Sequence, residues 1–301
     1  MQHINEMLAS MTGAGLLVDN LLFDGELHRV ATLDKPSQKN GWYVAFADGK
    51  SVMYGDWRSG IKEICSDKTK SITRDELLER EKAKARHKQD KLAKEVTSAK
   101  ACIKQWLKAD EVFTHPYLVR KRIKPYGIRV DQNNNLLVPV LDDGGKLISL
   151  QYIDKSGNKR LKAGGRMKGG ALLLGSLTVQ TTVLVCEGYA TGCSLHEATG
   201  LPTIVAFNAC NLMAVCTLYK ATSPWAMLVV CSDNDHQSER KNGRNTGLEI
   251  GKEVATKLNL RTIWPTFESD NDGSDFNDVH CQHGLEHLRV ILSQVLAGGS
   301  N

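Results

Sequence analysis

The chain has 301 residues, of which 41% are hydrophobic, and this is enough for two or three globular domains with buried cores. It has no apolar run of about eighteen residues and no signal-peptide pattern at its N-terminus, so we expect neither a membrane-spanning nor a secreted protein. Its eight cysteines include no CxxC pair, which favours reduced thiols and a cytoplasmic location. The net charge of +5 is small but unevenly distributed along the chain.

Residues 1–70 predict a small β-rich module. Two stretches with alternating apolar positions, LLFDGELHRVATL and GWYVAFADGKSVMYGDW, contain the turn dipeptides Asp24-Gly25 and Asp48-Gly49. Five aromatic side chains in this module could form part of a hydrophobic core, which is the commoner role, or could stack on nucleic-acid bases. These aromatic residues are Trp42, Tyr43, Phe46, Tyr54 and Trp57.

Residues 71–108 predict one long, charged connecting helix. The stretch from Thr73 to Lys108 contains neither Gly nor Pro, and Thr73 with Glu76 has the spacing of a capping box. The first half is so highly charged that most of it must be solvated. Two roles stay open for this helix, a spacer between domains or a basic face that follows phosphates.

Residues 109–180 predict a basic subdomain of mixed α and β structure. The runs LLVPV and LISLQYI, joined by DDGG, indicate a β-hairpin that leads into a glycine-rich loop. Glycines in this loop allow a phosphate to approach the backbone, but no GxxxxGK[ST] motif occurs in the chain, so any phosphate binding here uses another geometry. From residue 159 to 168 the loop has five basic residues and no acidic one: Lys159, Arg160, Lys162, Arg166 and Lys168.

Residues 181–301 alternate short apolar runs with segments of helical length. The runs VLVCE, TIVAF, AMLVVCS and RTIWP have the character of buried strands. Helices are expected around 190–199, 210–221, 244–258 and 284–296. This alternation predicts an α/β domain with a parallel sheet covered by helices on both faces.

Acidic residues follow three of these predicted strands. Ligands of an open parallel sheet bind beyond the carboxyl ends of the strands, so we expect these side chains to converge at one edge. Carboxylates in such proximity repel one another, and a divalent cation with oxygen ligands, Mg²⁺ or Mn²⁺, would offset the repulsion. The acids are Glu187 after the first run, Asp233 and Asp235 after AMLVVCS, and Asp275 and Asp278 in the phrase DFND.

Two simpler explanations compete with parts of this metal site. Asp233 and Asp235 around an asparagine could form only a turn, yet a glutamate at the matching position after a neighbouring strand favours a shared site. The group His280, Cys281 and His283 could suggest zinc, but zinc-type spacing and a second ligand pair are missing, so no zinc is expected.

The segments VLVCEGYATGCSLHEATGLPTIVAF, VVCSDNDH and DFNDV resemble the Toprim domain, which DnaG-type primases share with type IA and type II topoisomerases. The resemblance places Glu187 on the family's glutamate, Asp233 and Asp235 on its DxD motif, and Asp275 and Asp278 on its downstream acids. Upstream, HPYLVRKRIKPYGIR and the basic loop are similar to the segment that precedes Toprim in phage and plasmid primases. The first seventy residues also resemble a small module of some of these primases.

The resemblance implies a DNA primase that makes short RNA primers on single-stranded DNA from ribonucleoside triphosphates, in plasmid or phage replication. It implies catalytic and metal-binding roles for Glu187, Asp233 and Asp235, with Glu187 holding an ion or assisting deprotonation. The zinc module common in DnaG-type primases is missing, and so is a helicase motif, which implies a separate helicase partner. The resemblance also implies that basic residues of both upstream segments contact the template or the triphosphate. These residues are Arg120, Lys121, Arg122, Lys159, Arg160, Lys162, Arg166 and Lys168.

Three other functions are compatible with parts of the pattern. A Toprim nuclease would use the same acids to hydrolyse a phosphodiester, but the basic segment before the Toprim region favours a primase. A non-catalytic protein that binds or loads on single-stranded DNA would not need the intact set of acids. A topoisomerase is disfavoured, because no length remains for a gate-forming domain with a tyrosine nucleophile.

Overall fold

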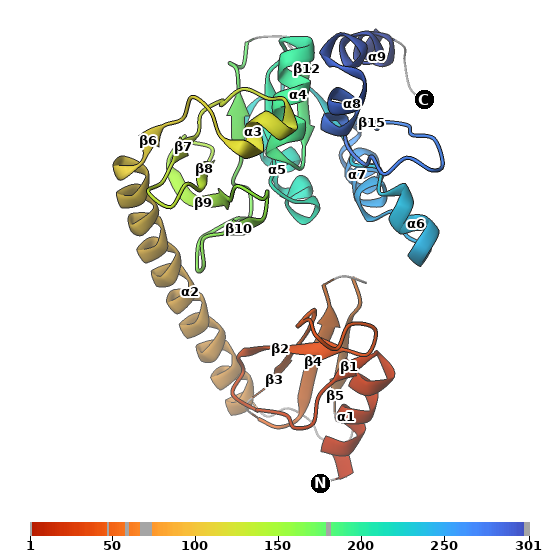
Figure 1. The fold of residues 1–301 in the computed structure, drawn as a ribbon. Coiled ribbons are helices and arrows are strands. Elements are labelled where there is room, and N and C mark those ends of the chain that lie inside the picture. The colour runs from red at the N-terminus through yellow and green to blue at the C-terminus, as the bar shows by residue number, and fades with distance from the viewer. Residues whose placement is uncertain (1, 47, 58–59, 67–73, 179–181, 298–301) are drawn as a thin grey trace. The chain divides into compact units, whose positions relative to one another are not determined.

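The computed structural model describes residues 2–46, 48–57, 60–66, 74–178 and 182–297. The chain divides into an N-terminal unit, Met1–Asp90, and a C-terminal unit, Lys91–Asn301 (Figure 1). The boundary lies within the long helix α2, Arg74–Lys108. Thr73, the expected N-cap of this helix, lies outside the described residues. None of the described helices is both long and apolar enough to cross a membrane.

The N-terminal unit is a five-stranded antiparallel sheet with one helix packed on it. The helix α1, Gln2–Gly13, was not expected from the sequence, and it buries Met7 and Met11 against the sheet. The strands follow one another in chain order across the sheet. The expected turn at Asp48-Gly49 lies between the third and fourth strands. The strands are β1 (Leu16–Leu17), β2 (Leu27–Thr32), β3 (Gly41–Ala45), β4 (Ser51–Asp56) and β5 (Lys62–Ser66).

The C-terminal unit begins with a second antiparallel sheet, in the strand order β10-β9-β8-β7-β6. The expected hairpin is confirmed as β8 and β9, and the short helix α3, Pro116–Lys121, precedes it. The predicted basic loop is a strand at its start, because Lys159, Arg160 and Leu161 pair with β9 as β10. The strands are β6 (Asp110–Glu111), β7 (Arg129–Val130), β8 (Leu136–Leu141), β9 (Leu147–Ile153) and β10 (Lys159–Leu161).

The third sheet has the strand order β11-β13-β12-β14-β15. Its last four strands are parallel, as the sequence predicted, and β11 is an antiparallel edge strand that the sequence did not reveal. The fold class of an α/β domain preceded by a mixed subdomain and a β-rich module is thus confirmed. The strands are β11 (Leu172–Leu174), β12 (Thr182–Cys186), β13 (Thr203–Val205), β14 (Met227–Cys231) and β15 (Arg261–Ile263).

Helices cover both faces of this sheet. In β12, Leu184 and Cys186 pack with α4, α8 and α9, whereas Val183 and Val185 pack with α5 and α7. Alternate residues of a strand point to opposite faces, so burial on both sides produces the continuous apolar runs seen in the sequence. The helices are α4 (Tyr189–Thr199), α5 (Ala209–Thr222), α6 (His236–Asn242), α7 (Thr246–Leu258), α8 (Phe276–His283) and α9 (Leu285–Ala297).

Candidate metal and nucleotide site

Glu187 and Asp233 leave the parallel sheet at the same edge. Cys186 ends β12 and Cys231 ends β14, and these two residues are paired directly. The chain runs from β12 to β13 on one side, whereas β14 leads to β15 on the other side. The order of strands therefore reverses between β12 and β14, and the crevice at such a point is where open α/β sheets bind ligands.

The carboxyl groups of Glu187 and Asp233 are poorly solvated and lack full hydrogen bonding. Oε1 of Glu187 and Oδ1 of Asp233 are buried and have no hydrogen-bond partner. Burial, with the charges of Asp235 and Asp275, raises the pKa of Glu187 to about 7. Burial, together with the charges of Glu187, Asp275 and Asp235, also raises the pKa of Asp233 well above its ordinary value. Buried carboxyl groups this close are unfavourable when both are ionised, so they retain protons or bind a cation.

The backbone around Asp233 and Asp235 is held by helix α7. Asn245, the N-cap of α7, accepts a hydrogen bond from the Asp235 backbone N–H at 2.9 Å and donates to Asn234 Oδ1 at 2.8 Å. The backbone N–H of Gly247 donates to Asp235 Oδ2 at 3.2 Å. A Cβ at Gly247 would lie 2.8 Å from the Asp233 carbonyl oxygen, so only glycine allows this close approach.

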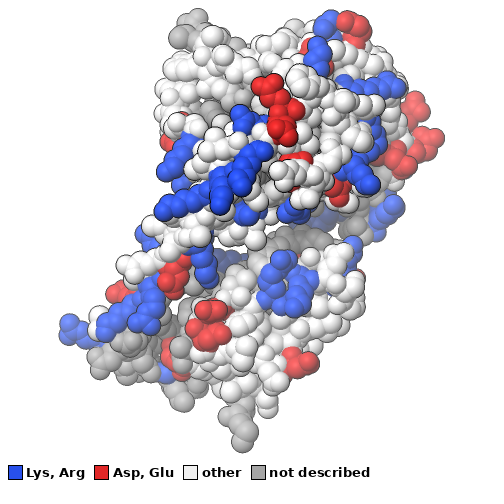
Figure 2. Space-filling model, turned by 60° about the vertical axis from the view of Figure 1, so that its left-hand side comes forward, with Lys and Arg blue, Asp and Glu red and all other residues white. Residues whose placement is uncertain are grey.

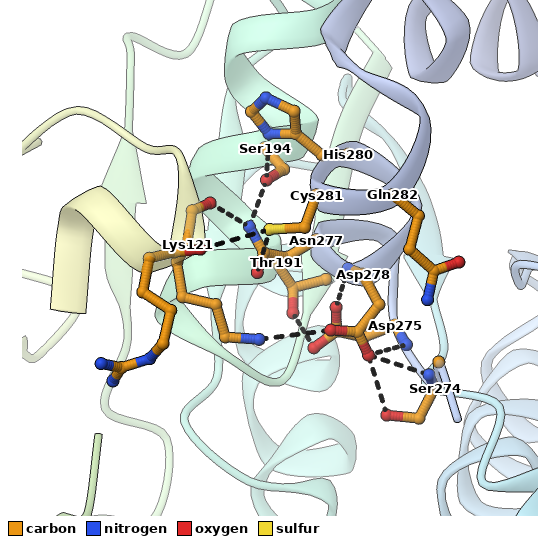
Figure 3. A network of polar contacts seen from close by, with 12 residues as sticks. Lys121, Thr191, Ser194, Ser274, Asp275, Asn277, Asp278, His280, Cys281 and Gln282 are labelled. Atoms are coloured by element: carbon orange, nitrogen blue, oxygen red, sulfur yellow. Dashed lines mark hydrogen bonds and ion pairs between the residues drawn. The ribbon is translucent and has the colours of Figure 1, made fainter. Parts of the chain in front are cut away.

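Asp275 and Asp278 form a capping box at the start of α8. Asp275 Oδ1 accepts from the Asp278 backbone N–H at 2.9 Å, and Asp278 Oδ2 accepts from the Ser274 backbone N–H at 2.9 Å. Asp275 Oδ2 also accepts from Thr191 Oγ1 at 3.1 Å, which joins α8 to α4 (Figure 3). Burial and the charge of Asp278 raise the pKa of Asp275. Helix capping is therefore enough to explain where Asp275 and Asp278 lie. The charge of Asp275 nevertheless raises the pKa values of Glu187 and Asp233.

A buried polar network ties the basic helix α3 to the α/β domain (Figure 3). Asn277 is fully buried, and its side-chain amide donates to the Lys121 carbonyl at 2.8 Å and to Ser194 Oγ at 2.9 Å. His280 Nδ1 lies 3.0 Å from the same Ser194 oxygen. Lys121 Nζ forms an ion pair with Asp278 Oδ1 at 3.3 Å. The group His280, Cys281 and His283, considered above for zinc, thus contains a residue of this network.

The predicted basic residues have different surroundings. Lys159 lies beside the acids, because its Nζ is 3.7 Å from where a Cβ on Gly188 would be, and its charge lowers the pKa values of Glu187 and Asp233. Arg160 stacks over the ring of Tyr152 at 4.1 Å, and Arg166 forms an ion pair with Asp142 at 3.7 Å. Arg120 donates to the carbonyl of Lys155, on the turn before β10.

Figure 2 shows Lys and Arg side chains in a band on the visible face of the C-terminal unit. Most of the predicted basic residues of this unit are exposed, whereas Lys121 and Lys162 are half-buried. A surface of this kind attracts the phosphates of a nucleic acid. The exposed members of the predicted set are Arg120, Arg122, Lys159, Arg160, Arg166 and Lys168.

The donor set fits a divalent cation that is shared with a phosphate ligand. Among the described residues, no three His, Cys, Asp or Glu side chains are grouped closely enough to enclose a metal ion by themselves. Mg²⁺ commonly takes one or two carboxylates and completes its shell with water and substrate phosphates. The two buried oxygens without partners, on Glu187 and Asp233, are free to take that role.

Several residues that shape this site were missed in the sequence. The sequence around Asn245 could have identified its role, since an asparagine followed by a helical pattern is a typical N-cap. No local pattern identifies the roles of Thr191, Ser194 and Asn277, because their partners are distant in the chain. Asn277, for example, contacts a residue 156 positions away.

Comparisons with known proteins identify the class of this domain. Residues 182–286 match the family model of the Toprim domain. The match includes Glu187, Asp233, Asp235, Asp275 and Asp278.

Two relatives are both named DNA primase TraC, from Escherichia coli. One is 28% identical over 258 residues, which cover 82% of this chain and 24% of that protein. The other is 29% identical over 274 residues, covering 85% of this chain and 18% of that protein. The chain thus spans a quarter or less of the length of these relatives. The predicted Toprim domain is confirmed by the family model, and the chain is similar to these proteins named DNA primase.

Among solved structures, the primase fragment of the bacteriophage T7 primase-helicase protein is similar. It has a TM-score of 0.47 and 15% sequence identity, and the alignment covers 63% of this chain and 77% of that one.

Proposed function

We propose that this chain is a DNA primase, which synthesises short RNA primers on a single-stranded DNA template by nucleotidyl transfer. The observation that carries the proposal is the pair Glu187 and Asp233 at the reversal point of a Toprim sheet, each with a buried oxygen that has no partner. The relatives named DNA primase support the same reaction.

The acids would hold the metal ion that the reaction needs. Glu187, Asp233 and Asp235 are the proposed ligands, and Asp275 and Asp278 add negative charge behind them. A bound Mg²⁺ or Mn²⁺ would neutralise the triphosphate and the charge that develops during transfer. Glu187 would either hold an ion or accept the proton of the attacking 3′-hydroxyl.

The basic residues would bind the two polyanionic substrates. Lys159 lies beside the acids and is the proposed contact for the triphosphate, since its charge acts on both Glu187 and Asp233. The exposed cations Arg120, Arg122, Arg160, Arg166 and Lys168 are the proposed contacts for the template backbone, with Lys121 and Lys162 at the edge of this surface. A separate replicative helicase and a cytoplasmic setting of plasmid or phage replication belong to the same proposal.

A single reaction distinguishes this proposal from its alternatives. The protein is incubated with single-stranded DNA, labelled ribonucleotides and Mg²⁺ or Mn²⁺, and the products are resolved by length. Short labelled RNA supports the primase, a shortened template indicates a nuclease, and bound but unchanged DNA indicates a binding or loading protein. Either of the last two outcomes would overturn the proposal.

A further inference from the structure

The sheet of the N-terminal unit has two different faces. On one face, Tyr43 and Tyr54 belong to a hydrophobic cluster with Met7 and Met11 of α1, and Ser10 of α1 contacts the Tyr54 hydroxyl at 2.6 Å. The residues that alternate with Tyr43 and Tyr54 along these strands point to the other side of the sheet and do not belong to the cluster with α1. We call this second side the open face.

The open face is defined by two rows of directly paired residues, which share a side of the sheet because opposite residues in antiparallel strands do so. The apolar row crosses four strands as Leu27, Val44, Met53 and Ile64. The second row crosses the same strands as Arg29, Trp42, Gly55 and Lys62. These eight positions, all of them described, include two cations and no acid.

Gly55 allows the indole of Trp42 to lie against the sheet. A Cβ at Gly55 would lie 2.9 Å from Cζ2 and 3.0 Å from Cε2 of Trp42, and 2.2 Å from the carbonyl oxygen of Ile61. A side chain at this position would therefore push the indole away from the sheet. The glycine at position 55 thus lets the indole of Trp42 lie against the sheet, where Trp42 is only 8% exposed.

An exposed aromatic ring lies next to Trp42 and beneath an arginine. The ring of Trp57 has its centroid 6.0 Å from that of Trp42, and the Arg29 guanidinium carbon lies 4.9 Å from the Trp57 centroid. Arg29 is held there by hydrogen bonds from Nε and Nη2 to the Lys39 carbonyl at 3.1 and 2.8 Å. Although it has these neighbours, Trp57 is 48% exposed. An oriented aromatic ring beside a fixed cation is a typical platform for an unstacked base.

Apolar and charged groups on the open face suit the two parts of a nucleic-acid strand. Ile64 is 65% exposed and Leu27 is 49% exposed, so apolar surface extends to both sides of the tryptophans. Arg29 and Lys62 provide positive charge within the same face, without an acid beside them in the two rows. Apolar and aromatic surface favours bases, and the cations favour phosphates.

We propose that the open face binds single-stranded nucleic acid, with a base stacked on Trp57 and phosphates at Arg29 and Lys62. This site is separate from the Toprim acids and would hold a strand independently of any chemistry. It goes beyond the proposed function, because neither nucleotides nor a metal ion are needed for it.

The test uses the full chain with EDTA and without nucleotides, and measures the anisotropy of labelled oligothymidylate. We expect Trp57→Ala to weaken binding at least about fivefold, as the loss of one stacking aromatic does, and Trp57→Phe to retain part of the affinity. Arg29→Gln should weaken binding and reduce its salt dependence. The matched control is Trp225→Ala, the same change at an exposed tryptophan of the C-terminal unit, which should leave affinity unchanged. Duplex of the same sequence should bind equally to wild type and Trp57→Ala, since its bases are already stacked.

Other occupants of the open face give different results. Equal affinity of wild type and Trp57→Ala for the single strand would overturn the proposal. A wild-type dimer that Trp57→Ala dissociates, seen by sedimentation, would assign the face to a second copy of the chain instead. Shielding of Trp57 from acrylamide quenching in the DNA-free protein would assign it to another part of the same chain. Primer synthesis is measured separately, so a chain that binds DNA through Trp57 but makes no primer refutes only the proposed function.

Discussion

Cys186 and Cys231 lie directly opposite each other at the ends of the parallel strands β12 and β14. This pairing brings the next carboxylates of the two strands, Glu187 and Asp233, to one edge of the sheet. Their proximity has an electrostatic consequence, because the charge of Glu187 raises the pKa of Asp233.

Neutral isosteres of the two acids should separate catalysis from binding. We expect Glu187→Gln and Asp233→Asn each to reduce primer synthesis at least about 100-fold, since each loses a ligand or proton acceptor. Affinity for single-stranded DNA should stay within about twofold, because the basic surface is unchanged. Asp272→Asn, at an exposed acid in the loop before α8, is the matched control and should retain full activity. Equal synthesis by wild type and Glu187→Gln would refute the metal-site assignment.

The stability of the metal-free protein should fall as pH rises. The raised pKa of Glu187, about 7 against an ordinary 4.5, means that the folded state keeps a proton which the unfolded state loses. This stabilisation is complete below the ordinary pKa and is lost as pH rises through the folded pKa. We expect the Tm in EDTA to drop by at least about 3 °C between roughly pH 5 and pH 8.

Two additions identify the source of that drop. Glu187→Gln should flatten the dependence of Tm on pH, because the titrating group is gone. Mg²⁺ added to wild type at high pH should raise the Tm through binding to the folded state, and should raise it less in the variant. A Tm profile that is the same for wild type and variant would exclude Glu187 as the cause.

Lys159 should tune the pH at which the acids ionise. Its charge lowers the pKa values of Glu187 and Asp233, so Lys159→Met should raise both and move the ascending limb of the activity profile to higher pH. The KM for ribonucleotides should also rise, if Lys159 contacts the triphosphate. Lys155→Met removes an exposed cation from the turn before β10 and should shift neither quantity. An unchanged pH profile in Lys159→Met would contradict the placement of this cation.

Gly247→Ala should disturb the position of Asp233. The added methyl would lie 2.8 Å from the Asp233 carbonyl oxygen and 3.1 Å from its Cβ, so either the strand exit or α7 must move. Because small displacements of catalytic groups are costly, we expect at least about a tenfold loss of primer synthesis with DNA affinity retained. Gly144→Ala, whose methyl would meet its nearest atom at an ordinary 3.5 Å, is the control. Full activity of Gly247→Ala would show that the site tolerates such movement.

Asn277→Ala should destabilise the C-terminal unit. The change removes the amide that donates to the carbonyl of Lys121 and to the hydroxyl of Ser194, at a cost of about 1–3 kcal/mol in the free energy of unfolding. Urea unfolding of wild type and variant measures this difference. Gln282→Ala, at an exposed position on the same helix, should change stability by less than about 0.5 kcal/mol. A similar small effect at Asn277 would mean that water replaces the lost amide.

The parts of the fold that the sequence predicted are those with strong local patterns. The parallel strands β12, β13 and β14 are buried on both faces over most of their length and therefore appear as apolar runs, and the helices between them are long enough to recognise. The helix α1 was missed, since only two methionines, Met7 and Met11, mark its buried side. The edge strand β11 was missed because its three leucines follow a glycine-rich segment without an alternating pattern.

The candidate site was partly predictable for a similar reason. Strand ends identified Glu187 and Asp233, because the carboxyl edge of a parallel sheet is a general location for ligands. Asp275 and Asp278 show the limit of this reasoning, as the spacing that suggests ligands also makes a capping box. The network around Asn277 joins residues more than eighty positions apart, and only the folded chain brings them together.

The direct pairing of β12 with β14 also makes the site sensitive to the length of a strand. Side chains alternate between the two faces, so a single residue inserted between Val229 and Cys231 would turn the following positions to the opposite layer of helices. The carboxylate of Asp233 would then leave the edge at a different height and direction from Glu187. The pairing of β14 with β12 therefore fixes how many residues of β14 can precede Asp233 if this acid is to meet Glu187 at the edge.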